Sequence, residues 1–393
     1  MSGFAVDWLN LLIRWAHLIA GIGWIGTSFY FVALDLSLKK REKMNPGVYG
    51  TAWEVHGGGF YHVEKFLNAP EHLPGDLIWY KWEAYLTWIT GFLLMVVQFY
   101  LYADLWLIDP DVMALEPWQA IGISVASLVI GWLIYDGLCR SPIGKNTPLL
   151  AGFVFLLILA AAYFYTNVFS ARSSLVHVGA FIGTIMAVNV FGIIVPNQKK
   201  ITASLLAGEA PDAKFGIIGK QRSTHNTYLT LPVLVMMVSG HYAMLTGHPQ
   251  SWILVGLIVI MGAMARHFLL RHEVGDPMNK IGWMLPVIAV VLVAAMWMTA
   301  PKATGDRAGA VVSDATVMAL SQKYCVTCHA ASPTNDAFEE APKNVRLETL
   351  DELRRYSSLI IKQTVETDVM PLGNELDMTQ DERQQLGAWL AQQ

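Results

Sequence analysis

Long apolar stretches recur along residues 1–300 and are separated by shorter polar connections. A helix needs about 20 predominantly apolar residues to cross roughly 30 Å of hydrocarbon. Eight stretches are long enough, or nearly so: Trp8–Leu34, Trp82–Tyr102, Trp118–Leu138, Thr147–Val168, Ser174–Pro196, Thr224–Thr246, Ser251–Leu270 and Ile281–Ala300. The pattern therefore predicts an all-α fold whose main domain, residues 1–300, is a polytopic bundle of about eight transmembrane helices.

The pattern changes after this domain. Residues 301–312 are polar, contain Gly and Ala, and are typical of a linker. Residues 313–393 then predict a small all-α domain with a first helix, a loop, a helix over Leu347–Thr364, a second loop and a last helix that ends near Trp389. The segment Thr379–Glu382 has the pattern of a capping box, which predicts the start of that last helix.

Basic residues are distributed unevenly among the connections. Alternate connections carry nearly all of them: Lys39, Lys40, Arg41, Lys43, Lys65, Lys81, Arg140, Lys145, Lys199, Lys200, Lys214, Lys220, Arg222, Arg271 and Lys280. In the other set of connections Arg172 is the exception. Because Lys and Arg favour the cytoplasmic side of a membrane, the bias predicts a multi-pass protein of the bacterial inner membrane with both its N- and C-termini in the periplasm.

The composition agrees with a membrane protein and limits the classes of function. Hydrophobic residues make up 54% of the chain and charged residues 15%, whereas soluble domains carry about 25% charged residues. The 14 Trp and 14 Tyr residues suit aromatic belts at two membrane interfaces. A net charge of −4 excludes a strongly basic nucleic-acid-binding protein, so we expect the lipid bilayer, and no nucleic acid, as a partner.

The most specific motif is the C-x-x-C-H segment Cys325-Val326-Thr327-Cys328-His329. Its two thiols can add to the vinyl groups of one porphyrin, and His329 then ligates the iron. A zinc site would need a second cysteine pair, but the chain has 3 Cys in all. The motif predicts a class I cytochrome c domain with a covalent haem c. Such haem is attached on the outer face of the inner membrane, where the loop charges independently place the C-terminal domain.

A methionine completes this set of metal ligands. Met370 lies in Val369-Met370-Pro371-Leu372-Gly373, where the proline favours a rigid loop that presents the sulfur. Met378 is the alternative, but it lies just before the predicted last helix. We therefore predict His329 and Met370 as the two axial ligands of the iron, a pair that raises the reduction potential of a cytochrome c.

Ionisable side chains in hydrocarbon are costly, which makes each one a candidate for function. His17, His177 and His241 lie in the outer halves of their predicted helices. Histidines on facing helices of a bundle can ligate a cofactor, so the three are candidate ligands of b-type haem in the membrane. The alternative is that each forms a hydrogen bond to a neighbouring helix.

A second polar group lies near the cytoplasmic ends of the predicted helices. His56 and His62 flank three glycines, which allow the backbone to approach a ligand closely. His225 and Asn226 follow Arg222 at the start of the sixth stretch. His can move protons near neutral pH and Asn can recognise an amide edge, so the four are candidate catalytic residues at a pocket for a small planar anion. The alternative is that such side chains extend to lipid headgroups, which we expect for Arg266 and His272.

Together these features resemble a known family. Arg14-Trp15-Ala16-His17, the segment Glu54-Val55-His56-Gly57-Gly58-Gly59-Phe60-Tyr61 and the fused cytochrome are similar to the bacterial membrane-bound urate oxidase (urate hydroxylase) family. The resemblance covers essentially the whole chain. It implies oxidation of urate to 5-hydroxyisourate, with electrons leaving through haem c to a soluble cytochrome c or a terminal oxidase. It carries over the ligands Cys325, Cys328, His329 and Met370.

Two other functions remain open from the sequence. One is a membrane electron-transfer subunit that connects quinol or a dehydrogenase to cytochrome c and has no organic substrate of its own. The other is a transporter fused to a redox sensor. If the chain oxidises urate, water supplies the hydroxyl oxygen and a base must accept a proton. For that base we favour His56 or His62.

Overall fold

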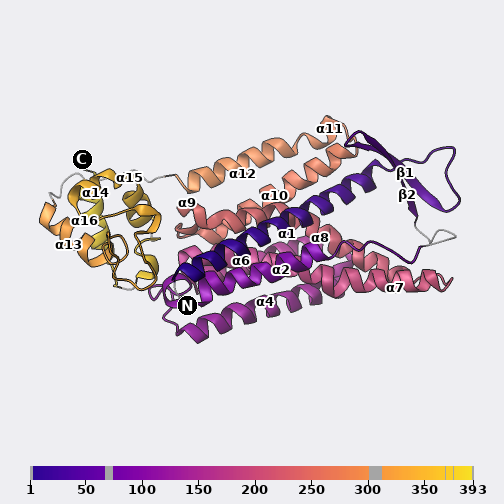
Figure 1. Ribbon diagram of the computed structural model, residues 1–393. Helices are drawn as coiled ribbons and strands as arrows, with labels where there is room; N and C mark the ends of the chain where they lie inside the picture. Colours follow the sequence, from indigo (N-terminus) through magenta and orange to yellow (C-terminus); the bar gives the residue numbers. More distant parts are fainter. Residues whose placement is uncertain (1–2, 67–73, 301–311, 368, 375, 392–393) are drawn as a thin grey trace.

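The computed structural model describes residues 3–66, 74–300, 312–367, 369–374 and 376–391. A bundle of long helices runs along most of the molecule, and a small C-terminal domain lies at one end of it (Figure 1). The bundle helices are α1 (Gly3–Ser37), α2 (Trp82–Met95), α4 (Pro117–Arg140), α5 (Thr147–Thr166), α6 (Ala171–Val188), α8 (Ala213–Val238), α10 (Ser251–Glu273) and α12 (Met284–Met298). The predicted linker 301–312 lies outside the described residues, apart from Val312.

Several shorter elements extend or connect these helices. A π-helical segment, Val96–Tyr100, continues α2, and another, Asn189–Ile194, joins α6 to α7 (Val195–Leu206). The remaining short elements are α3 (Ala103–Trp106), the 3-10 turn Pro142–Lys145, the 3-10 turn Ser239–His241, α9 (Ala243–Thr246) and α11 (Met278–Ile281). A π-helical turn inside a helix often marks a functional position, and Asn189 opens one of them.

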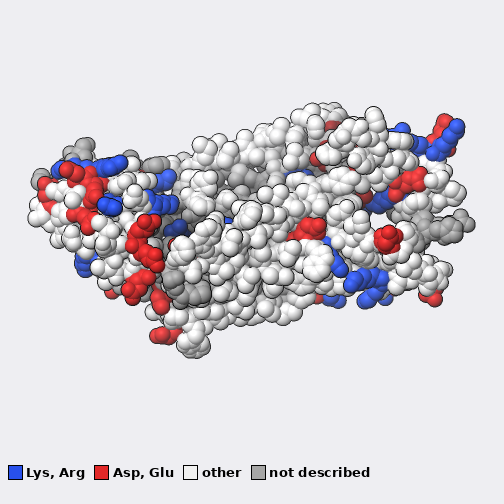
Figure 2. All heavy atoms as spheres, viewed as in Figure 1, with Lys and Arg blue, Asp and Glu red and all other residues white. Residues whose placement is uncertain are grey.

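Seven helices of the described chain have the length and apolar composition needed to cross a membrane. The eighth expected stretch, Thr224–Thr246, is not among them and is shifted in the structure. There α8 begins at Ala213, carries polar residues along its first half and ends at Val238. It nevertheless packs between α6 and α10. Figure 2 shows that most charged side chains on the visible face gather toward the two ends, which leaves a largely uncharged middle.

The two ends of the bundle differ as the loop charges predict. The N-terminus and the C-terminal domain lie at one end, while α7, α11 and the connection after α1 lie at the other (Figure 1). The basic residues of the predicted cytoplasmic connections belong to this second end. Capping fixes where several helices begin: Asn146 accepts the Leu149 N–H at the start of α5, and Glu116 and Gln119 form a capping box at α4.

The prediction of an all-α fold is incomplete, because the connection after α1 forms a β-hairpin. Strands β1 (Val48–His56) and β2 (Gly59–Phe66) are antiparallel and pair His56 with Gly59. Gly57 and Gly58 form the two-residue turn with φ of +59° and +80°. Both values are positive, as a type I′ turn requires, and glycine adopts them without strain. In this structure Gly57 and Gly58 form the turn of the hairpin.

The C-terminal domain is helical, as predicted, with α13 (Asp314–Tyr324), α14 (Leu350–Arg355), α15 (Ser357–Ile360) and α16 (Gln380–Leu390). The capping box at Thr379 and Glu382 is confirmed. The single helix expected over Leu347–Thr364 is wrong. Its first part is α14, which has a capping box of its own at Thr349. After Tyr356 the chain continues as α15 and a π-helical segment, Ile361–Val365.

Glu382 makes the stability of this domain depend on pH. Partial burial raises the pKa of its carboxyl group, but hydrogen bonds from Thr379 and Tyr324 and the charge of Lys323 outweigh this and lower the pKa to about 2. A carboxylate with a lowered pKa stabilises the fold at neutral pH, and this contribution is lost as the pH falls through about 4.5 toward 2. Glu382→Gln keeps the capping box but removes the charge.

We therefore expect Glu382→Gln to speed hydrogen exchange of the α16 amides at neutral pH, and the difference from the parent to shrink as the pH approaches 2. Mass spectrometry of the full chain in detergent, with parent and variant compared at each pH, would measure it. Asp381→Asn is the control, because Asp381 is an exposed residue in the same helical turn. A difference that persists unchanged at the lowest pH would rule out the charge as its cause.

Candidate functional sites

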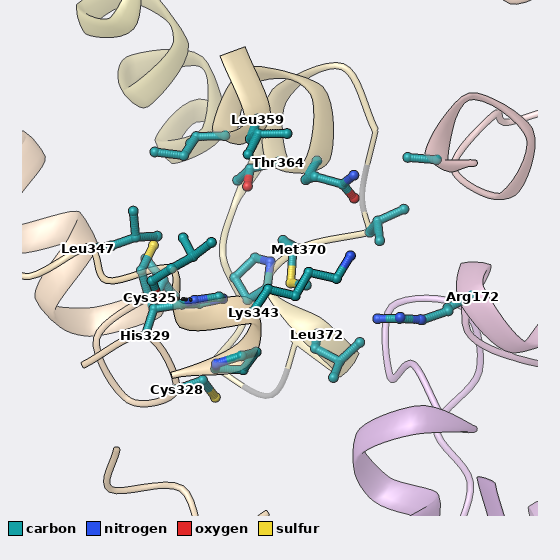
Figure 3. A pocket seen from close by; sticks show the side chains of 18 of the residues that line it. Arg172, Cys325, Cys328, His329, Lys343, Leu347, Leu359, Thr364, Met370 and Leu372 are labelled. Carbon is teal, nitrogen blue, oxygen red and sulfur yellow. Dashed lines mark hydrogen bonds between the residues drawn. The ribbon is translucent and has the colours of Figure 1, made fainter. Parts of the chain in front are cut away.

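A cavity of about 300 Å³ lies where the C-terminal domain meets the end of the bundle. Cys325, Cys328, His329 and Met370 all line it (Figure 3). The rest of the lining from this domain is largely apolar and includes Tyr324, Phe338, Leu347, Leu359, Ile360 and Leu372. The bundle contributes Leu105, Trp106, Arg172, Gly240, His241, Ala243 and Thr246. The cavity therefore belongs to both parts of the chain.

The motif at the wall of the cavity is a tight helical turn. The N–H groups of Cys328 and His329 both donate to the Cys325 carbonyl, at 3.2 and 2.8 Å. The His329 Nδ1 lies 2.9 Å from the Val345 carbonyl, to which it donates. This bond fixes the ring and leaves Nε2 as the nitrogen with a free lone pair. Neither thiol forms a disulfide in the described structure, and burial raises the pKa of the Cys325 thiol to about 11.

The structure also distinguishes the two candidate methionines. Met370 lines the cavity, and its backbone is held by the Gln363 carbonyl and by Arg383. Met378 is 4% exposed and packs in the hydrophobic core of the C-terminal domain, away from the cavity lining. Of the two methionines, Met370 is therefore the one that lines the cavity, and its role as a ligand stays a prediction. A thioether, an imidazole and two thiols around an apolar cavity are soft donors that suit a group containing a transition metal.

A second site is a polar cluster buried in the far half of the bundle. The Tyr135 hydroxyl lies 2.7 Å from His225 Nδ1. The Asn189 amide donates to the Tyr135 hydroxyl at 2.9 Å and to Asn226 Oδ1 at 3.0 Å. The Asn226 amide in turn donates to the Met186 carbonyl at 2.9 Å. Helices α4 and α8 and the π-helical segment after α6 thus bring His225 and Asn226, two of the predicted site residues, together.

Arg222 completes this cluster. It is 1% exposed, its Nη2 lies 2.6 Å from Asp136 Oδ1, and its guanidinium lies over the Tyr135 ring. Arg140 also pairs with Asp136, so two arginines share one carboxylate. Within the described chain, Arg222 Nε and Nη1 and Asn189 Oδ1 have no hydrogen-bond partner. Leaving a buried donor or acceptor unpaired costs about 1–3 kcal/mol, so a ligand with matching polar groups would be favoured here.

The remaining predicted catalytic residues lie elsewhere. His56 and His62 are exposed on the β-hairpin, and the His62 ring contacts Trp53 with centroids 4.5 Å apart. The structure does not bring them to His225 and Asn226. Their catalytic role stays a prediction.

The three histidines predicted as ligands of b-type haem occupy separate places. His17 Nδ1 lies 3.0 Å from the Thr87 carbonyl and 3.0 Å from the Thr90 hydroxyl. His177 is fully buried, with Nε2 at 2.9 Å from the Ser124 hydroxyl and Nδ1 at 2.8 Å from the Ser173 carbonyl. His241 lines the cavity instead. Among the described residues no three His, Cys, Asp or Glu side chains group into a metal site.

One expectation is wrong and two residues were missed. Arg266 was expected to reach lipid headgroups, but it is 2% exposed and its guanidinium lies 3.7 Å from the centroid of the Phe29 ring. Packing of α10 against α1 covers it.

Two residues of the cluster around Arg222 are not among the predicted ones. A lone amide in an apolar stretch, such as Asn189, is a signal of function. Tyr135 carries no such signal, because tyrosines are common at membrane interfaces.

A comparison with known protein families gives a match that covers the bundle. The family model described as Urate oxidase N-terminal matches residues 3–299. This range covers every bundle helix and ends before the C-terminal domain. Neither a curated protein nor a solved structure matches the chain.

Proposed function

The chain belongs to the urate oxidase N-terminal family, and from this premise we propose that it oxidises urate in the membrane and passes the electrons to a haem c in its C-terminal domain. The single observation that carries the proposal is the family match, because it spans α1 to α12. The cavity around the C-x-x-C-H motif adds independent support for a redox group at the end of the same chain. The proposed acceptor is a soluble cytochrome c or a terminal oxidase.

The residues around the cavity fit a covalent haem. Cys325 and Cys328 would hold it by thioether bonds, and His329 Nε2 and the Met370 sulfur would ligate the iron. His329 is already oriented by its bond to Val345, as ligating histidines usually are. When bound, the group supplies one-electron oxidation and reduction. The apolar walls would keep water from the group, which together with Met ligation would favour a raised potential.

For the substrate we propose the cluster around Arg222. Urate at neutral pH is a planar anion with amide N–H and C=O groups. The unpartnered Arg222 Nε and Nη1 can donate to its oxygens, and Asn189 Oδ1 can accept from one of its N–H groups. The balanced reaction joins one urate and one water to give one 5-hydroxyisourate, two protons and two electrons. Each of these polar groups of urate would give a hydrogen-bond partner to a buried protein atom that has none in the described structure.

His225 is the base that the structure supports best. Because the Tyr135 hydroxyl accepts the Asn189 N–H, it can donate its own proton to His225 Nδ1. A proton taken from water or urate can then move along a formed hydrogen bond. His56 and His62 stay alternatives that would require the hairpin to move.

Tyr135→Phe tests this role of the hydroxyl. We expect urate turnover to fall by about 10²-fold, the lower end of the contribution of a positioned acid–base group, with a changed pH profile. Steady-state rates across pH, with the KM for urate, would measure it. Tyr228→Phe is the matched control, since the Tyr228 hydroxyl also lies within hydrogen-bond distance of a histidine nitrogen, at 2.6 Å from His267 Nδ1, but outside the cluster around Arg222. Equal losses in the two variants would contradict a special role for Tyr135.

The electrons must cross most of the bundle. Tyr135 lies 18 residues along α4 from Pro117, about 27 Å at 1.5 Å per residue, and the C-terminal domain lies at the Pro117 end. A relay is therefore needed. His177 lies among the rings of Phe99, Tyr165 and Phe169, at 4.5–5.8 Å between centroids. We propose His17, His177 and His241 as relay positions.

Two forms of this relay are open. In one form the histidines hold b-type haem, which requires His177 to release Ser124 or the Ser173 carbonyl. In the other form the oxidisable phenol ring of Tyr165, beside His177, carries the electrons. A pyridine haemochrome spectrum separates the two, because a c-type band without a b-type component would remove the haem b form.

The deciding experiment for the whole proposal is anaerobic addition of urate to the purified full chain. We expect the reduced α-band of haem c to appear, with two haems reduced per urate consumed, since the oxidation releases two electrons. Xanthine, which lacks one of the urate oxygens, is the control. A haem that dithionite reduces but urate does not would show instead an electron-transfer subunit without this substrate.

A further inference from the structure

The cavity at the junction of the two parts has an uneven charge. Its lining includes the basic side chains of Arg172 and Lys343 but no Asp or Glu among the described lining residues. Lys343 is exposed, whereas Arg172 is half-buried at the start of α6, on the bundle side. Figure 3 shows the Arg172 side chain extending from the bundle toward the Met370 side of the cavity.

Arg172 lacks the partner that such a position usually demands. Its guanidinium lies over the Trp106 ring at 4.7 Å. No carboxylate of the described chain forms an ion pair with it. An arginine presents a rigid planar fork that matches a carboxylate with two parallel hydrogen bonds. A half-buried, unpaired guanidinium that faces a cavity without acids is therefore suited to an acidic ligand.

The C-terminal domain contacts the bundle segment 104–111, which includes the Trp106 ring beneath this arginine. The Phe338 ring packs edge-on against Trp106 with centroids 6.3 Å apart, and the Asn374 amide donates to Asp111. Gly373 approaches so closely that an added Cβ would lie 3.1 Å from the Asp104 carbonyl oxygen. Arg172 is thus part of the cavity in the docked arrangement.

We propose that Arg172 binds the carboxylates of the porphyrin held in this cavity, so that the membrane bundle forms part of the haem site. This inference rests on the proposed function, since it takes haem c as the group in the cavity. Haem carries two propionate groups, and the remainder of its edge is apolar like the cavity walls. Trp106, beneath the guanidinium, holds the arginine in place and shields it from water.

The reduction potential of the haem tests the proposal. A nearby cation favours the reduced state, which carries one positive charge fewer at the iron. We therefore expect Arg172→Gln in the full chain to lower the midpoint potential, measured by spectroelectrochemical titration. Arg41→Gln removes an exposed guanidinium from the connection between α1 and β1, which lies at the opposite end of the bundle (Figure 1), and should leave the potential unchanged. Lys343→Gln should give a smaller decrease, since solvent screens its charge.

Covalent attachment of the haem separates this proposal from the proposed function. A denaturing gel stained for haem peroxidase should show the group in the parent and in all variants, because Arg172 forms no thioether. An unstained parent would overturn the proposed function itself. If the parent is stained, but Arg172→Gln leaves the midpoint potential unchanged or raises it, only the proposed role of Arg172 is overturned. If the Gln variant does not accumulate, Arg172→Met, which suits an apolar wall, decides by the same measurement.

Discussion

Arg222→Lys should lower urate-dependent reduction of haem c by about 10²–10³-fold, a loss typical of removing one preorganised donor. Lysine keeps the positive charge beside Asp136 but lacks the planar fork. The Nη2 bond to Asp136 occupies one edge of the guanidinium, and only an arginine has Nε and Nη1 left to donate to an anion. Single-turnover reduction of the haem after mixing with urate would measure the effect.

The chain provides a matched control for this change. Arg266 is also buried and also has two unpartnered nitrogens, Nε and Nη2, but it lies over Phe29 between α10 and α1. Arg266→Lys should leave the rate of haem reduction by urate within a fewfold of the parent. If the two variants exchange their effects, the substrate binds at Arg266 and the assignment of the cluster around Arg222 is wrong.

Retention of the fold must be checked in Arg222→Lys, because breaking a buried ion pair costs roughly 3–5 kcal/mol. Lysine can still pair with Asp136, and Arg140 holds the same carboxylate from the other side. We therefore expect the far-UV spectrum and the stained covalent haem to match the parent. Loss of both would show a structural effect, and the smaller change Asn189→Ser would then test the same cluster from the acceptor side.

The bundle was largely predictable because hydrocarbon imposes a simple rule on length and polarity. Seven apolar helices follow from this rule. The rule gave the wrong bounds for α8, because the first half of this helix carries Arg222 and other polar residues. These residues are not suited to lipid, and Arg222 pairs with Asp136 of α4 instead. The hairpin was missed for a related reason. Glycines between two histidines predict close approach of a ligand, but Gly57 and Gly58 instead supply the positive φ values of a tight turn.

The two candidate sites differ in how close together their residues lie in the sequence. Cys325, Cys328 and His329 lie within five consecutive positions, so the sequence alone indicated them. The cluster around Arg222 is non-local: Tyr135, Asn189 and His225 come from three helices and meet only after packing. Arg172 was visible as the one basic exception among the outer connections, but its place in the cavity depends on how the C-terminal domain docks.

Replacing both Cys325 and Cys328 by Ser should abolish covalent haem and, with it, all transfer of electrons from urate to external cytochrome c. Serine cannot form the thioether bonds, and the buried cavity then has no attachment for the porphyrin. We expect the haem stain of the full chain to be lost and urate-dependent reduction of added cytochrome c to fall to background. The bundle should remain folded, since both cysteines belong to the C-terminal domain and the bundle has a hydrophobic core of its own.

The double variant also shows whether the bundle alone performs chemistry. An artificial acceptor such as ferricyanide can take electrons without the C-terminal haem. If Cys325→Ser/Cys328→Ser still oxidises urate with ferricyanide, the substrate site lies in the bundle and the haem is the outlet, as proposed. If the variant binds urate but ferricyanide restores no oxidation, the reaction requires the cavity itself. The substrate would then have to reach the Arg172 end of the molecule, and the cluster around Arg222 would not be its site.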